Sequence, residues 1–158
     1  MGVEMLGKTA IDRITGFSGL VVAFTEVIHN MDRVCLQPRA LGEDGQPKKP
    51  VWFDLCQVEF GDYSDVTVIP ATVIAMKIGD EVEDTLSNMK GTVVGISTYL
   101  NGCLRLGVQP KELKDGIPVD EAWLPPAQLK LIKAKVEINK PRSGGPGRSP
   151  KERSGARG

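Results

Sequence analysis

The sequence repeats itself at an offset of 72 residues. Residues 6–39 can be laid over residues 78–111 without a gap, and the matched positions share glycines, turn residues and the apolar pattern. One residue is then missing from the second copy, and the match continues at an offset of 71 as far as Gln57 and Gln128. Because self-similarity at a fixed spacing marks repeated structural units, the sequence predicts two copies of one small fold.

Three pairs of matched residues set out the framework that the copies share. The pairs are Gly19 with Gly91, Pro38 with Pro110, and Trp52 with Trp123. We expect each glycine where one strand ends and a curved strand begins, since glycine permits a positive φ or a bulge. Each proline should end the third strand or place it at an edge, because proline cannot donate to a β-ladder. The tryptophans fall in the alternation of apolar residues, which predicts that both face the core.

Each copy has the sequence pattern of short β-strands. Residues 19–30, GLVVAFTEVIHN, alternate in polarity and contain several β-branched residues, and no segment has a helical period of useful length. A strand-only unit of about sixty residues buries only roughly 60% of its unfolded surface, so two copies packed together should be more stable. The pattern G-x-x-x-x-D followed by G-x-V-V, which begins at Gly7 and again at Gly79, resembles SH3-like barrels, including the KOW type.

The repeat and the composition divide the chain into four parts. Residues 1–60 and 78–132 are predicted to form two tandem SH3-like β-barrels, which makes the fold class all-β. The connector, residues 61–77, is apolar, and we expect it to form a strand that bridges or covers the barrels, with Pro70 at a bend. If it stays exposed instead, it is a contact surface. Residues 133–158 are predicted to form a basic, extended C-terminal arm.

The neutral net charge hides an asymmetry between the body and this arm. The arm carries eight basic and two acidic residues, a net charge of +6, and the other twelve basic and eighteen acidic residues leave the body at −6. The candidate partner-binding residues of the arm are Lys140, Arg142, Arg148, Lys151, Arg153 and Arg157. Three interpretations of these residues stay open. They contact phosphates without sequence specificity, or they dock on an acidic protein surface such as a neighbouring copy's body. In the third interpretation the arm is a disordered extension that only makes the protein more soluble.

No arrangement of residues points to catalysis, a metal or a cofactor. The one histidine, His29, precedes a turn and is interpreted as a loop residue, and the sequence has no nucleophile-elbow, P-loop or zinc-protease motif. Three cysteines without a Cys-x-x-Cys favour small buried side chains over a zinc site or a disulfide framework. The longest apolar runs are too short for a membrane-spanning helix. We therefore expect a protein that is not an enzyme and does not enter a membrane.

The repeated unit also resembles small proteins of tailed bacteriophages and prophages. The resemblance rests on GFSGLVV (16–22), YLNGCLRLGVQPK (99–111), DGIP (115–118) and the pairs Trp-Phe and Trp-Leu that precede Gln-Val and Gln-Leu. It implies a virion structural protein, specifically a capsid decoration (cement) protein assembled in the host cytoplasm, whose partners are capsid or other virion proteins in multiple copies. Two alternatives stay open: a KOW-like nucleic-acid or ribosome-associated protein acting through the arm, and an adaptor or inhibitor that binds a host protein.

Overall fold

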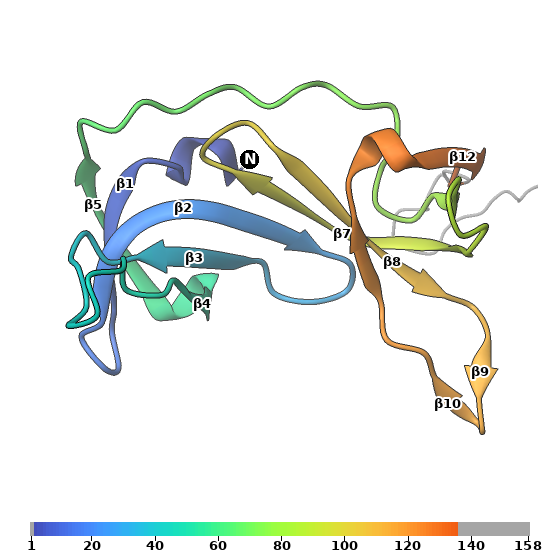
Figure 1. Cartoon of the computed structure of the whole chain (residues 1–158), viewed down its shortest axis with the longest axis horizontal. Coiled ribbons are helices and arrows are strands. Elements are labelled where there is room, and N and C mark those ends of the chain that lie inside the picture. The colour runs from blue at the N-terminus through green and yellow to red at the C-terminus, as the bar shows by residue number, and fades with distance from the viewer. Residues whose placement is uncertain (1, 136–158) are drawn as a thin grey trace, which may run out of the picture.

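The protein is all-β, with its strands paired antiparallel (Figure 1). The structure is a computed structural model that describes residues 2–135. The first copy contains η1 (Gly2–Met5), β1 (Lys8–Asp12), β2 (Ser18–Val27), β3 (Arg33–Gln37), β4 (Val51–Asp54), η2 (Leu55–Gln57) and β5 (Val58–Tyr63). The second copy contains β6 (Glu81–Asp84), β7 (Lys90–Tyr99), β8 (Leu104–Pro110), β9 (Leu113–Lys114), β10 (Ile117–Pro118), β11 (Ala122–Leu124), η3 (Pro126–Gln128) and β12 (Leu129–Lys133). From β1 and from β6 onward the two halves share one element order. The first half alone begins with η1, and the second has the β9–β10 hairpin where the first has a single bridge between Leu41 and Pro47.

The long strands β2 and β7 join the two halves into one ten-stranded sheet. Along one edge, the first residues of β2 pair with β1 and its last residues pair with β7. Likewise, the first residues of β7 pair with β6 and its last residues pair with β2. The sheet stays open, because within the described chain β4 pairs only with β3, β5 only with β1, β11 only with β8 and β12 only with β6. The closed barrels expected from the sequence are therefore absent, since the outer strands of each half do not pair with each other: β4 does not pair with β5, and β11 does not pair with β12.

The pairing of β2 with β7 relates the two halves by an approximate two-fold axis. Thr25 lies directly opposite Ser97, the residue that matches it in the repeat. Their side-chain oxygens are 2.6 Å apart and form a buried hydrogen bond. Because two equivalent antiparallel strands meet at matched residues, the axis passes between these two side chains, as in a symmetric dimer interface. The duplicated chain thus folds as a dimer-like pair covalently joined into one molecule.

Each half has its own hydrophobic core. The first is built from Leu6, Ala10, Val21, Phe24, Val34, Leu36 and Val58, and the second from Val82, Val93, Leu106, Val108 and Leu129. Phe53 and Leu124 pack against these cores, whereas Trp52 and Trp123 do not. The expectation that both tryptophans face the core is therefore wrong, because the apolar residue that follows each of them in the chain takes the inward position.

The framework glycines lie where two strands approach closely, and the framework prolines lie at the ends of strands. Gly19 and Gly91 lie inside β2 and β7, and neither has a positive φ. The bulge that was the other expectation lies later in each strand, between Val21 and Ala23 and between Val93 and Gly95. A Cβ atom at Gly91 would lie 2.5 Å from the carbonyl oxygen of Gln109, so glycine is needed there because β8 approaches closely. Pro38 follows the last residue of β3, and Pro110 is the last residue of β8, in line with the expectation that they end these strands.

The doubled Gln-Pro turn is held in the same way in both halves. The side-chain amide of Gln37 donates to the carbonyl oxygens of Pro38 and Lys48, and the amide of Gln109 donates to those of Pro110 and Val119. Each glutamine therefore ties the end of its strand to the chain returning toward the tryptophan strand. The repeated motif is a structural device for closing a loop.

A carboxylate closes the first turn of each half. Asp12 accepts hydrogen bonds from the backbone N–H and hydroxyl of Thr15 and from the side-chain amide of Gln57. In the second half, Asp84 accepts the matching bonds from Ser87 and Gln128. Asp12 and Asp84 thus make the local turn hydrogen bonds expected of short acidic residues at such positions, and they also reach the end of the next 3-10 turn.

The connector covers both cores without forming a strand. Its first residues complete β5, which ends at Tyr63, and residues 64–80 contain no helix or strand. Val68 packs against the first core, and Ile74 and Met76 pack against the second. The segment crosses from one half to the other in a single pass (green in Figure 1). It therefore covers both halves as expected, but by its side chains and not by a β-ladder.

Candidate functional site

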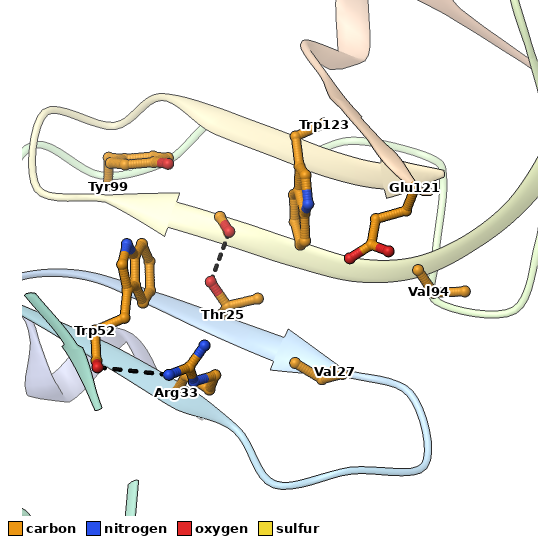
Figure 2. A pocket seen from close by; sticks show the side chains of 9 residues that line it. Thr25, Val27, Arg33, Trp52, Val94, Tyr99, Glu121 and Trp123 are labelled. Carbon is orange, nitrogen blue, oxygen red and sulfur yellow. Dashed lines mark hydrogen bonds between the residues drawn. The ribbon is translucent and has the colours of Figure 1, made fainter. Parts of the chain in front are cut away.

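A cleft lined by both tryptophans lies where the two halves meet. Its volume is about 420 Å³. Its lining residues are Thr25, Val27, Arg33, Trp52, Val94, Ser97, Tyr99, Glu121 and Trp123. Figure 2 shows the indoles of Trp52 and Trp123 on either side of Thr25. Because both halves contribute, neither copy of the repeat can form this cleft alone.

Strand register places the aromatic side chains on the face of the sheet away from the cores. Directly opposed residues of antiparallel strands share one face, and Tyr99, Ala23, Cys35 and Trp52 are opposed in turn across β7, β2, β3 and β4. The neighbouring pair Val34 and Phe53 belongs to the core and so faces the other way. Trp52 and Tyr99 therefore belong to one transverse row of this outer face.

The two-fold axis generates a second row that ends at Trp123. This row runs through Val27, Gly95, Gly107 and Trp123. A Cβ atom at Gly95 or Gly107 would lie within 2.9 Å of the indole of Trp123. The second half therefore has glycine under its tryptophan, where the first half has Ala23 and Cys35, and the Trp123 ring lies directly against the backbone of two strands.

Four polar groups surround the aromatic rings. Thr25 and Ser97 are buried, and their hydroxyls share one hydrogen bond. The guanidinium of Arg33 forms a salt bridge, since its Nε lies 3.2 Å from a carboxylate oxygen of Asp54. Glu121, by contrast, forms no salt bridge within residues 2–135, and its carboxylate lies beside Trp123 in Figure 2. The cleft is therefore aromatic, with one carboxylate that no described cation neutralises.

Arg105 is the counterpart of Arg33 in the second half. It is exposed and donates to the carbonyl oxygen of Trp123 at 3.5 Å. The residue that matches Asp54 is Pro125, so the ion pair of the first half has no equivalent here. Arg105 is not among the residues that line the cleft. The polar surroundings of the two tryptophans therefore differ, although their backbone positions match.

Three titratable groups with shifted pKa values are held by burial or by turn hydrogen bonds. Of the three cysteines expected to be buried, Cys35 is buried, whereas Cys56 and Cys103 are exposed. Burial raises the pKa of the Cys35 thiol to about 11, so this residue is a neutral thiol at physiological pH. Asp12 and Asp84 have pKa values below the ordinary 3.8, chiefly because the hydroxyls of Thr15 and Ser87 donate to them, and both carboxylates are committed to turns. Among residues 2–135, no group of three or more histidine, cysteine, aspartate or glutamate side chains is placed to hold a metal ion.

None of the residues that line the cleft was chosen as a binding residue from the sequence, where Trp52 and Trp123 were expected in the core. Lys140, Arg142, Arg148, Lys151, Arg153 and Arg157 lie outside the described residues. His29 is exposed in the turn after β2, with φ of 58°, and does not line the cleft. The signal for the cleft was present in the sequence as small residues opposite the tryptophans, but recognising it requires the strand register.

The fold and the site together define an all-β protein of two matched halves that share one aromatic cleft. No protein-family model matches the chain, and no curated protein or solved structure matches it either. None of the helical segments in residues 2–135 has the length and apolar character needed to cross a membrane.

Proposed function

We propose that the chain is a non-enzymatic structural protein of a phage particle, specifically a capsid decoration protein built from two tandem SH3-like units and a basic arm. The proposal draws its phage context from the resemblance of the repeated unit to small phage and prophage proteins. The observation that carries it is a set of exposed apolar side chains that occur twice, once in each half.

Two exposed apolar positions are shared by the halves. Ile14 and Leu86, which match in the repeat, each have 76% of their surface exposed. Leu41 and Leu113 also match, and they are 66% and 63% exposed. Single exposed apolar residues are common on protein surfaces. Their occurrence at the same positions in both halves supports the interpretation that each half presents the same contact points to a partner.

A repeated contact surface fits attachment to a shell built from many identical subunits. Weak contacts made by each half add, since the second contact forms at high effective concentration once the first is made. The β9–β10 hairpin, which projects from the second half in Figure 1, carries the exposed Ile117 and gives that half an additional contact. The arm, with its net charge of +6, supplies electrostatic attraction to an acidic protein surface.

Co-sedimentation with purified capsids tests this function. The wild-type protein should pellet with capsids, and the double variant Leu41→Ser, Leu113→Ser should pellet several-fold less. Val73→Ser is the matched control, because Val73 is a fully surface residue of the connector with no such counterpart, and it should leave pelleting unchanged. Failure of the wild-type protein to pellet with any intact particle from its own phage would refute the proposal.

A second candidate function rests on the basic arm. If the arm binds nucleic acid through phosphates, the isolated protein should bind DNA or RNA with affinity that falls steeply with salt. Deletion of residues 140–158 should abolish that binding. This result, without capsid association, would favour the KOW-like nucleic-acid or ribosome-associated function, and specific capture of one host protein would favour the adaptor or inhibitor function.

A further inference from the structure

We propose that the tryptophan cleft binds the chain's own arm, through residues 141–158, PRSGGPGRSPKERSGARG. The contact is made by prolines and arginines of this segment against Trp52, Trp123 and Tyr99, with Glu121 as the anionic partner. The inference does not rest on the proposed decoration function, because it concerns only two parts of one chain.

The first argument is the shape and chemistry of the cleft. Its two hydroxyls are buried and hydrogen-bonded to each other, and its remaining lining is largely aromatic and aliphatic. Grooves lined by aromatic side chains are the usual docking sites for extended, proline-containing segments, whose rings pack flat against the indoles. Residues 141–158 contain three prolines, Pro141, Pro146 and Pro150, and no aromatic residue. The proline rings of this segment can therefore pack against the aromatic rings of the cleft.

The second argument is charge. An arginine guanidinium binds favourably over the face of a tryptophan ring, and an adjacent carboxylate adds to that attraction. Glu121 lies beside Trp123 and has no cationic partner in the described chain, whereas Arg33 is already neutralised by Asp54. Residues 141–158 carry five basic residues against the single acidic Glu152. The unmatched carboxylate of the cleft is thus complementary to the segment.

The third argument is reach. The described chain ends at Lys135, and five residues separate it from Pro141. An extended chain spans roughly 3.3–3.6 Å per residue, so the arm after Lys135 can extend up to about 80 Å. The segment can therefore enter the cleft of its own molecule or that of a neighbouring copy.

Intrinsic fluorescence can test the inference on the full-length chain. Both tryptophans of the protein line the cleft and the segment contains none, so tryptophan emission reports on the cleft alone. The variant Arg142→Gln, Arg148→Gln, Arg153→Gln, Arg157→Gln removes four charges from the arm and leaves the body unaltered. Its emission should differ from that of the wild type. Adding a synthetic peptide of residues 141–158 should restore the wild-type spectrum along a saturable curve.

A charge-matched pair of substitutions shows whether the peptide occupies the cleft. In the four-glutamine background, Glu121→Gln should weaken peptide binding by about two- to five-fold, as expected for loss of one exposed charge pair. Glu112→Gln removes the same charge from the loop before β9, outside the cleft, and should leave binding unchanged. Absence of any peptide-dependent change, or equal weakening by both substitutions, would overturn the inference.

Dilution then identifies which copy supplies the arm. Wild-type emission that is independent of protein concentration shows binding within one molecule. Emission that shifts toward that of the four-glutamine variant on dilution shows binding between copies. Once peptide binding to the cleft has been shown, this comparison decides which copy supplies the arm. It does not depend on capsid binding, so failure of the decoration function would leave the experiment unaffected.

Discussion

Truncation of one core should destabilise both halves of the molecule together. Leu106 is fully buried in the second core. Replacing such a leucine by alanine removes its packing and leaves a cavity, which costs about 2–5 kcal/mol. For a two-state protein with a urea m-value of roughly 2 kcal/mol/M, Leu106→Ala should lower the unfolding midpoint by about 1–2.5 M.

Each half contains one tryptophan, so the two halves can be followed separately. In the variant Trp123→Phe the emission reports on the first half, and in Trp52→Phe it reports on the second. Because β2 and β7 pair along five residues and the connector packs against both cores, Leu106→Ala should shift both reporters by the same amount.

The matched control is Leu131→Ala in the same half. Leu131 is 41% exposed in β12, and its truncation should change stability by no more than about 0.5 kcal/mol. A shift confined to the Trp123 reporter, with the Trp52 reporter unchanged, would refute the reasoning, because it would mean that the halves unfold as independent domains.

Three further predictions follow from individual contacts. Gly91→Ala places a methyl group 2.5 Å from a β8 carbonyl oxygen and should lower the urea midpoint, with a cost of about 1–3 kcal/mol. Gly107→Ala should displace the indole of Trp123, so the emission spectrum changes while the midpoint moves little, since the ring is partly exposed. Hydrogen bonding from Ser87 lowers the pKa of Asp84 below 3.8, so its carboxylate stabilises the fold above that pH and loses this contribution as pH falls through the lowered value. Asp84→Asn should therefore be less stable than wild type at pH 7, and the difference in urea midpoints should shrink below about pH 4.

The strands and the repeat were predictable because their signals are local. Alternation over residues 19–30 and its matched copy correspond to β2 and β7, and the proline positions correspond to strand ends. The paired turns at Asp12 and Asp84 also follow from short-range chemistry, since a carboxylate there accepts hydrogen bonds from residues two and three positions later.

The faces of the sheet and the joining of the halves were not predictable in the same way. Alternation shows that Trp52 and Phe53 point to opposite faces of the sheet, but it does not say which face is the core. That is decided by pairing with β3, where Phe53 lies opposite the core residue Val34 and Trp52 lies opposite Cys35. Likewise, nothing local in β2 indicates that its last residues pair with β7 across the repeat. The cleft depends on both of these long-range facts, so sequence reasoning passed over it and selected the arm.

The most direct test of the account is whether Thr25 and Ser97 face each other in solution. Hydrogen-bonded and non-hydrogen-bonded pairs alternate along an antiparallel ladder, and the Ile28 N–H donates to the Val94 carbonyl three residues further along. Thr25 and Ser97 are therefore a non-hydrogen-bonded pair, in which the Cα atoms lie about 4.5 Å apart. NMR spectra of the labelled full-length protein should show a strong Hα–Hα contact between these two residues. Its absence, while the β1–β2 and β6–β7 contacts within each half are present, would contradict the joined sheet and the shared cleft.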